Sequence, residues 1–310
     1  MTNLPKIALG AWAWGNDGTF GGSPTADTLR PIFDKAMENG LNLWDTAYAY
    51  GMGTSEKVLA GFVKELPRDS YLISDKFTPQ CASSSPTAMQ DMIEMQLGLM
   101  ELDRFDIYWI HNVWYAPKWI TELAKYFEGK DNAPLIGVSN HDLAEIRQAN
   151  EILQAHGLKL SAVQNHYSLI NRSSEESGIL DYCKENGITF FSYMVLEQGA
   201  LSGKYDTAHP MPAGSARAAT YDPVLDKLEI LNSTLGKIAD KYGVGIAQIP
   251  VAWAIAKGTL PIIGVTKVSH VEDAVKAANI TLTAADVSEL ESVSDSLGLN
   301  VIRMWEKEMK

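Results

Sequence analysis

The chain alternates eight short apolar runs with longer segments of helical periodicity, and this alternation limits its fold more than any other feature. The runs are Lys6–Leu9, Leu41–Trp44, Tyr71–Ser74, Phe105–Ile110, Leu135–Val138, Ser161–Val163, Ile188–Ser192 and Leu260–Ile263. Strands that alternate with helices form parallel sheets joined by right-handed crossovers. Eight such units in about 250 residues are typical of a (β/α)8 TIM barrel.

The segments between the runs carry apolar residues at helical spacing. The first segment has apolar residues at positions i, i+3, i+4, i+7 and i+8 and a glycine stop signal at Gly40; its apolar residues are Leu29, Ile32, Phe33, Ala36 and Met37. Residues 89–100 and 142–156 follow the same scheme. Residues 226–242 and 284–296 predict two additional helices, one before the last barrel unit and one at the C-terminus.

We expect a single domain over residues 1–310, because no low-complexity linker divides the eight units. A doubly wound open sheet is the alternative, but no G-x-G-x-x-G pattern follows the first run. Residues 199–222 lack periodicity, which predicts a long loop that is functional or mobile. Pro250 lies inside an apolar helical segment, where it should kink or delay the helix.

Composition narrows the range of partners. The net charge is −12 and no block of lysine and arginine is present, which argues against nucleic acid or an anionic membrane surface. No apolar run approaches the roughly 20 residues that cross a bilayer. The start of the chain shows no signal-peptide pattern, so we expect a cytoplasmic protein. Cys81 and Cys183 lie far apart in the sequence, which predicts that both are reduced and that they form no metal site. The sequence shows no coiled coil and no dimer stripe, so a monomer is slightly favoured.

Titratable residues that could take part in proton transfer follow three of the apolar runs. Asp45 and Tyr50 follow the second run, Lys76 the third and His111 the fourth. In a barrel of this kind the catalytic face lies at the carboxyl ends of the strands, so these side chains should meet at one rim.

The chemistry of such a group can be derived from its members. A lysine cation lowers the pKa of a neighbouring tyrosine, and an aspartate keeps the lysine charged. A histidine can orient a carbonyl group by hydrogen bonding. The set therefore predicts a tyrosine acid that protonates a developing alkoxide, and it needs a cofactor because it contains no hydride donor.

Each of these four residues also has an ordinary structural interpretation. Asp45 could cap a helix, and Tyr50 could be an ordinary tyrosine without a catalytic role. Lys76 could be a solvated strand terminus and His111 a hydrogen-bonded core residue. The joint occurrence of all four at strand ends favours a site.

The motifs around these residues resemble the aldo-keto reductase family. The segment WDTAYAYGMGTSEKVLAGFV resembles the family signature around its aspartate and tyrosine, LISDKF its lysine strand and FDIYWIHN its histidine strand. LIGVSNH, AVQNHYSLINR, LSGKY and LPIIGVTK continue the match in order. The resemblance extends from about Ile7 to about Val287.

The resemblance implies a nicotinamide cofactor, usually NADPH, and reduction of aldehydes or ketones to alcohols. Tyr50 would be the general acid, Lys76 and Asp45 its tuning pair, and His111 the substrate-orienting group. Ser139, Asn140 and Gln164 would hold the nicotinamide carboxamide, and Tyr193 would stack on the nicotinamide ring. The other implied cofactor contacts are Leu196, Gln198, Leu201, Gly203, Lys204, Arg217, Gly264, Thr266, Lys267, His270 and Asp273.

Some positions depart from the family pattern. Met194 and Ala274 stand where the family often has serine and asparagine. Lys267 remains as the partner for the 2′-phosphate, but it lacks the bidentate fork of arginine. We therefore expect NADPH with a weaker preference than is usual, and NADH as a possible substitute. Arg217 is either a residue that closes over the cofactor or a solvated loop residue.

Aromatic residues near the rim predict a mostly apolar substrate pocket. We expect Trp14 and Trp114 to line it with Tyr50 and His111, and Trp12 to be a packing residue beneath the site. Trp305 could reach the pocket if the tail folds back. Such a pocket suits small aromatic, aliphatic or dicarbonyl substrates.

Three functions are compatible with this pattern. The first is a carbonyl reductase that uses NADPH. The second is a regulatory subunit that binds the cofactor without turnover. The third, an isomerase or lyase with a Schiff base on Lys76, is disfavoured because a lysine paired with aspartate stays protonated and poorly nucleophilic.

Overall fold

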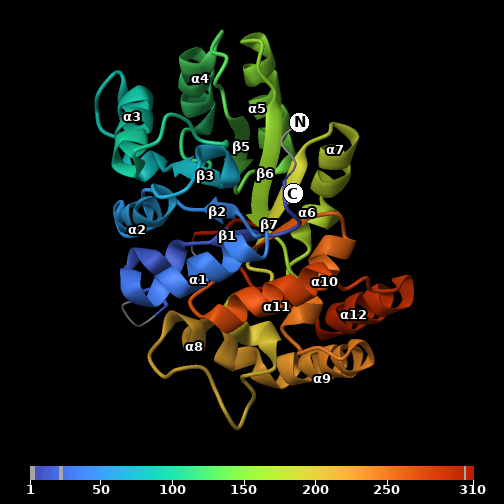
Figure 1. Cartoon of the computed structure of the whole chain (residues 1–310). Coiled ribbons are helices and arrows are strands. Elements are labelled where there is room, and N and C mark those ends of the chain that lie inside the picture. Colours follow the sequence, from blue (N-terminus) through green and yellow to red (C-terminus); the bar gives the residue numbers. More distant parts are fainter. Residues whose placement is uncertain (1–3, 21–23, 304) are drawn as a thin grey trace.

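Eight parallel strands close into one barrel in the computed structural model, which describes residues 4–20, 24–303 and 305–310 (Figure 1). The strands are β1 (Ala8–Gly10), β2 (Leu43–Asp45), β3 (Leu72–Phe77), β4 (Ile107–Ile110), β5 (Leu135–Ser139), β6 (Leu160–His166), β7 (Thr189–Tyr193) and β8 (Leu260–Gly264). Each strand pairs with the next, and β8 pairs with β1 through Leu9 and Ile263. The predicted (β/α)8 class is confirmed.

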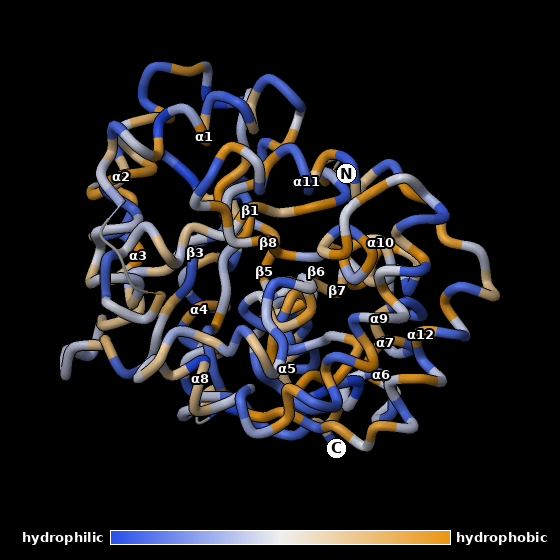
Figure 2. The backbone as a smooth tube through the Cα atoms, turned by 90° about the horizontal axis from the view of Figure 1, so that it is seen from below, coloured by the Kyte–Doolittle hydropathy of each residue, from blue (hydrophilic) through white to orange (hydrophobic). Residues whose placement is uncertain are grey.

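Helices surround the barrel in both views (Figures 1 and 2). They are α1 (Ala26–Glu38), α2 (Thr54–Val63), α3 (Ala88–Met100), α4 (Ala116–Phe127), α5 (Leu143–Ala155), α6 (Ser173–Glu176), α7 (Ile179–Glu185), α8 (Ala216–Tyr221), α9 (Leu225–Tyr242), α10 (Gln248–Ala256), α11 (Val268–Ala278) and α12 (Ala284–Leu297). The two additional helices predicted from periodicity are α9 and α12, with bounds that differ by one residue. Among the described residues, no helix is both long and apolar enough to cross a membrane.

Local sequence explains where several of these helices begin. Thr25, Asp142 and Thr283 are the N-caps of α1, α5 and α12, and each forms a reciprocal capping box with the residue three positions later. A capping box satisfies two backbone N–H groups that the first turn of a helix leaves free. The caps of α1 and α5 fix the points at which the chain turns from a strand-end loop into the outer layer, and the cap of α12 fixes the start of the helix that follows α11.

The interior of the barrel is filled by large side chains. The rings of Trp109 on β4 and Phe191 on β7 meet edge to face, with their centroids 5.1 Å apart. Gly137 on β5 pairs with Trp109, and a Cβ atom at residue 137 would lie 2.2 Å from the indole ring. The glycine therefore provides the space that the tryptophan occupies. Figure 2 shows hydrophobic segments concentrated in the strands and more hydrophilic ones on the outer loops.

Two details of the prediction need correction. β3 continues to Phe77, so Lys76 lies inside the strand rather than after it. The segment 199–222 is not one long loop, because it contains the 3-10 turns of residues 197–202 and the helix α8. Of the two effects expected of Pro250, a kink or a delayed helix start, its position agrees with the second. It is the third residue of α10, where the backbone makes no intrahelical N–H bond.

We predict that Gly137→Ala lowers the free energy of unfolding by about 1–3 kcal/mol, because the added methyl group would clash with the ring of Trp109. Urea denaturation would measure the change. Gly61→Ala is the control, since Gly61 lies in α2 with open space around its Cβ position. This control should stabilise the protein by about 0.5–1 kcal/mol through helix propensity. Equal stability of the two variants would contradict the packing of Trp109 against Gly137.

Candidate active site

A buried ion pair at the carboxyl ends of β2 and β3 forms the centre of the candidate site. The Nζ atom of Lys76 donates hydrogen bonds to Oδ1 of Asp45 at 2.5 Å and to the carbonyl oxygen of Thr46 at 2.7 Å. The other carboxylate oxygen of Asp45 accepts hydrogen bonds from the Ser74 hydroxyl at 2.7 Å and the Gln164 amide at 3.2 Å. Burial acts to lower the pKa of Lys76, but the charges and hydrogen bonds of Asp45 and Tyr50 together outweigh it and keep this pKa above its ordinary value. The ammonium group therefore stays charged.

Tyr50 lies over this ion pair. Its ring centroid is 4.9 Å from the Nζ atom of Lys76. Burial raises the pKa of Tyr50, and the charge of Lys76 opposes this effect without overcoming it. Lys76 therefore lowers the pKa of Tyr50, as expected. Because burial has the larger effect, the phenol remains protonated at neutral pH and can act as a proton donor.

The turn that carries Tyr50 is held by a close backbone contact. Gly51 has a φ of 69°, and a Cβ atom there would lie 1.9 Å from the carbonyl oxygen of Gly15. Only glycine permits this approach. The contact joins the Tyr50 turn to the 3-10 helix Trp12–Gly15 that follows β1.

His111 follows β4 and meets Tyr50 edge to face, with ring centroids 5.8 Å apart. Its Nδ1 atom is 2.7 Å from the hydroxyl oxygen of Thr78. Burial lowers the pKa of His111 to about 3, with a smaller contribution from the charge of Lys76, so the imidazole is neutral at physiological pH. The structure thus brings the sequence-predicted residues Asp45, Tyr50, Lys76 and His111 to one end of the barrel.

The aromatic wall of the site differs from the expectation. Trp12, expected to be a packing residue, stacks on Tyr50 with ring centroids 5.4 Å apart and an angle of 16°. Trp305, from the C-terminal tail, meets Trp12 edge to face at 5.9 Å. The two indoles form a corner beside the phenol of Tyr50.

Trp14, expected in the substrate pocket, is a core residue instead. Its side chain has no exposed surface, its Nε1 atom donates a hydrogen bond to the carbonyl oxygen of Val265, and its ring packs on Trp44 and Phe62. Trp12 and Trp14 belong to one 3-10 helix, in which side chains two positions apart point in different directions. Trp114 lies on the outer rim, 55% exposed, where its ring is near Tyr115.

The ends of β5, β6 and β7 present groups that suit a carboxamide. Among the described residues, the hydroxyl proton of Ser139 and the side-chain oxygen of Gln164 have no hydrogen-bond partner. One is a donor and the other an acceptor, which matches the C=O and NH2 groups of nicotinamide. Asn140 has a φ of 63°. Its side-chain nitrogen donates to the carbonyl oxygen of His111, and its side-chain oxygen accepts from the hydroxyl of Tyr193 at 2.5 Å. Asn140 therefore stabilises the site through contacts within the protein.

The segment after β7 has an unusual backbone. Gln198 and Gly199 have φ values of 53° and 100° inside the 3-10 turns Glu197–Ser202. Arg217 of α8 reaches this segment, where its Nη1 atom donates to the carbonyl of Gln198 at 3.4 Å and its buried Nε atom has no partner among the described residues. An unpaired buried guanidinium nitrogen fits an anionic ligand.

Other residues expected to contact the cofactor in this segment have structural roles. The side chain of Leu201 is fully buried in the core, and its backbone N–H donates to Leu196. Gly203 has a φ of 71°, and a Cβ atom there would meet Ile246 at 2.5 Å.

Lys267 and His270 lie at the start of α11, which follows β8. Burial lowers the pKa of His270, the ammonium groups of Lys267 and Lys204 lower it further, and the carboxylate of Asp273 opposes them. Lys267 is the N-cap of α11, and the backbone N–H of Thr266 donates to Nδ1 of His270 at 3.2 Å. Asp273 is turned towards α10, where its carboxylate accepts from Gln248 at 2.6 Å. Gly264, at the end of β8, pairs with Gly10 of β1.

Sequence reasoning missed a buried ionic cluster that anchors the tail, residues 301–310. Glu197 accepts hydrogen bonds from Nε2 of His166 at 2.5 Å, from Arg303 at 2.9 Å and from the hydroxyl of Tyr221 at 2.6 Å. Arg303 also donates to Glu306 at 2.9 Å. The tail also contacts β6, because the amide of Asn165 lies 3.6 Å from the sulfur of Met309.

The charges of this cluster balance. Burial acts to lower the pKa of His166, but the carboxylates of Glu197 and Glu306 outweigh it and raise this pKa to about 9. Burial acts to raise the pKa of Glu197, whereas His166 and Arg303 hold it at about 2. Two cations therefore face two anions. His166 also stacks on Tyr193, with ring centroids 5.7 Å apart, so the cluster supports a wall of the candidate site.

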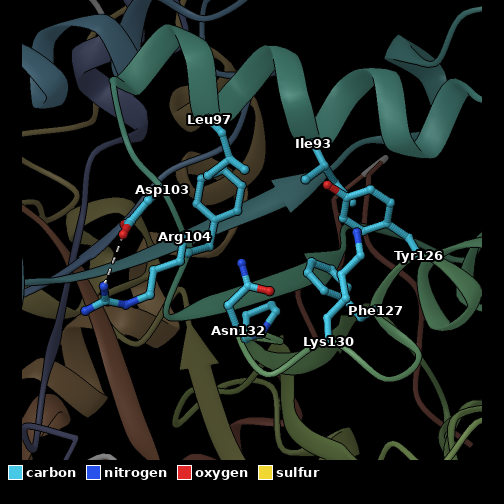
Figure 3. A pocket seen from close by; sticks show the side chains of 10 residues that line it. Ile93, Leu97, Asp103, Arg104, Tyr126, Phe127, Lys130 and Asn132 are labelled. Carbon is cyan, nitrogen blue, oxygen red and sulfur yellow. Dashed lines mark ion pairs between the residues drawn. The ribbon is translucent and has the colours of Figure 1, made fainter.

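The cavity in Figure 3 is not part of this site. It lies between α3 and α4, with Ile93 and Leu97 on one side and Tyr126 and Phe127 on the other. Its volume is about 30 Å³, which is room for about one water molecule. A substrate or nucleotide does not fit there.

Comparison with known sequences gives a consistent result over nearly the whole chain. A model of the Aldo/keto reductase family matches residues 6–295. The chain is 32% identical over 306 residues to a chloroplastic pyridoxal reductase from Arabidopsis thaliana, covering 93% of this chain and 83% of the relative. It is 27% identical over 323 residues to an NADH-specific methylglyoxal reductase from Escherichia coli, covering 95% and 96%.

Solved structures show the same fold. A glycerol dehydrogenase from Gluconobacter oxydans superposes with a TM-score of 0.83 at 22% identity, covering 97% of this chain and 94% of that chain. An aldo-keto reductase from Klebsiella pneumoniae in complex with NADPH superposes with a TM-score of 0.74 at 22% identity, covering 99% and 95%.

We predict that Arg303→Met destabilises the protein by about 3 kcal/mol or more, because it leaves a buried carboxylate short of one charged partner. Urea denaturation near pH 7 would measure this loss. Lys307→Met is the matched control in the same tail, since Lys307 bridges Asp142 and Glu145 with about a third of its side chain exposed. The control should cost less than about 1 kcal/mol. Equal, small losses in both variants would contradict anchoring of the tail by the buried cluster.

Proposed function

Because the chain belongs to the aldo/keto reductase family, we propose that it reduces a small aldehyde or ketone to an alcohol, with NADPH as its cofactor. Family membership makes the protein an NAD(P)H-dependent oxidoreductase. The observation that carries the finer proposal is the phenol of Tyr50 held over the Lys76–Asp45 pair and beside His111. The bound cofactor would supply the hydride that the protein side chains lack.

In this proposal Tyr50 is the general acid. It donates its hydroxyl proton to the carbonyl oxygen as the carbonyl carbon receives the hydride. The resulting phenolate lies beside the ammonium of Lys76, whose charge favours the ionised phenol. Asp45 and the carbonyl of Thr46 hold that ammonium in place. Catalysis then relies on charges that are fixed before the substrate arrives.

The residues that would hold the cofactor form three groups along the carboxyl ends of β5–β8. Ser139 and Gln164 offer a donor and an acceptor to the carboxamide, and Tyr193 offers a ring face that His166 does not cover. Arg217, with Lys204, Lys267 and His270, would meet the phosphates. The other residues assigned to this site from sequence are Asn140, Leu196, Gln198, Leu201, Gly203, Gly264, Thr266 and Asp273, and their contribution would be through backbone shape and packing.

Related proteins bear on the choice of cofactor. The Klebsiella pneumoniae structure contains NADPH, whereas the Escherichia coli relative is NADH-specific. The positive charges of Lys267 and Lys204, which both act on His270, favour NADPH because only this cofactor carries a 2′-phosphate.

The alternatives find less support. A Schiff base would require a free lysine amine, but Lys76 is fully buried and donates to two oxygen acceptors. A regulatory subunit would not need an assembled proton donor. The substrate pocket proposed is lined by Tyr50, His111, Trp12 and Trp305, with Trp114 at its outer rim.

We predict that Tyr50→Phe lowers kcat by roughly 10²- to 10⁴-fold, because it removes the proton donor. The test is NADPH oxidation against a panel of aldehydes, ketones and dicarbonyls. Cofactor affinity, followed by fluorescence titration, should stay nearly unchanged. Tyr182→Phe on α7 is the control and should keep normal turnover. Full activity in Tyr50→Phe would refute the assignment of the acid, and tight NADPH binding without turnover in the native protein would favour the regulatory alternative.

We also predict that Lys267→Ala weakens NADPH binding on the order of tenfold while changing NADH binding little, since a charge-assisted bond to the 2′-phosphate is lost. Dissociation constants for both cofactors would be compared. Lys276→Ala, at the other end of α11, is the control and should affect neither cofactor. Equal losses for NADPH and NADH would place the phosphate site elsewhere.

A further inference from the structure

Thr78 contacts the candidate catalytic histidine at Nδ1, the ring nitrogen across from Nε2. It follows β3 and has only 6% of its surface exposed. Its hydroxyl oxygen is 2.7 Å from Nδ1 of His111. Thr78 and Lys76 are two positions apart, so they point to the same side of the chain as it leaves the strand. This alternation is a sequence signal that could have identified Thr78 as a residue of the site.

The backbone around His111 is fixed from two strands. The N–H of His111 donates to the carbonyl of Phe77 at 2.9 Å, and the carbonyl of His111 accepts from the side chain of Asn140 at 3.2 Å. The imidazole is therefore attached to a rigid support. What remains to be set is which of its two nitrogens carries the single proton of the neutral ring.

Two arrangements of that proton are possible. In the first, the Thr78 hydroxyl donates to Nδ1, and Nε2 carries the proton. In the second, Nδ1 donates to the hydroxyl oxygen, and Nε2 carries a lone pair. No other hydrogen bond of the Thr78 hydroxyl is present among the described residues. The second arrangement would therefore leave a buried hydroxyl proton without an acceptor, which is unfavourable.

We propose that Thr78 is a positioning residue that sets the tautomer of His111, by donating its hydroxyl proton to Nδ1 so that Nε2–H faces the substrate. This inference rests on the proposed carbonyl reduction. A carbonyl oxygen accepts hydrogen bonds, so only the Nε2–H tautomer can bind and polarise it. Because the pKa of His111 lies far below neutral, the tautomer and not the charge of the ring is the property that Thr78 controls.

Two variants separate the hydroxyl from the shape of the side chain. Thr78→Val keeps the volume of the side chain and removes the hydroxyl, whereas Thr78→Ser keeps the hydroxyl and removes a methyl group. If Thr78→Val does not fold, Thr78→Ala takes its place, because it also lacks the hydroxyl. The results expected for Thr78→Ala are those expected for Thr78→Val. A role in packing alone would make Thr78→Ser the less active of the Ser and Val variants.

The first readout does not require turnover. Long-range ¹H–¹⁵N NMR spectra of protein with ¹⁵N-labelled histidine distinguish protonated from unprotonated ring nitrogens. The sequence holds six histidines, and the spectrum of His111→Phe assigns the signals of His111 by their loss. Native protein and Thr78→Ser should show His111 protonated at Nε2. Thr78→Val should show a mixture of tautomers or the Nδ1–H form.

The second readout is steady-state reduction of a carbonyl substrate with NADPH. We expect kcat to fall roughly 10- to 100-fold in Thr78→Val with little change in KM, because a hydrogen bond to the carbonyl oxygen strengthens as negative charge develops there. Thr78→Ser should restore kcat to within about threefold of the native value, on the same grounds. The dissociation constant for NADPH should be the same in all three proteins.

The outcomes distinguish this inference from the proposed function. Protonation of Nδ1 in the native protein, or an unchanged tautomer in Thr78→Val, would overturn the role of Thr78 even if the native enzyme reduces carbonyl compounds. Absence of carbonyl reduction by the native protein would overturn the proposed function, while the NMR spectra would still decide whether Thr78 sets the tautomer.

Discussion

The carboxylate of Asp45 is the fixed point on which the rest of the candidate site depends. A charge at the end of a packed barrel is stable only if its hydrogen-bonding capacity is used, and Asp45 receives hydrogen bonds from Lys76 and Ser74 of β3 and from Gln164 of β6. The bond to Gln164 crosses the barrel. One side chain thus links the proton-donating group near β2–β4 to the strand that would hold the cofactor.

The barrel and its four polar strand-end residues could be predicted from sequence because both follow from periodic patterns. Apolar runs that alternate with helical segments define the strands, and barrel topology brings their carboxyl ends together. Asp45, Tyr50, Lys76 and His111 needed no further information to be placed near one another. The exact end of β3 was less predictable, because Asp75 and Lys76 interrupt the apolar pattern while remaining inside the strand.

The features that could not be predicted depend on side-chain direction or on distant partners. Trp12 and Trp14 differ by two positions in a 3-10 helix, and no periodic pattern shows which of them faces Tyr50. One partner of Glu197 is Arg303, which is 106 positions away in a tail whose described residues form no helix or strand. Charged residues are rarely buried, so sequence alone predicts that Glu197 and Arg303 lie on the surface. Only their mutual pairing reverses that expectation.

The order of the strands separates two tasks along the chain. The groups proposed to move the proton lie between residues 45 and 111, and the groups proposed to hold the cofactor lie between residues 139 and 273. Substitutions in the second part can therefore change the nucleotide that is accepted without altering the acid. Two hydrogen bonds join these parts, from Gln164 to Asp45 and from Asn140 to the carbonyl oxygen of His111. A lineage could exchange NADPH for NADH through changes after β5 alone, and the protonation chemistry would be inherited unchanged.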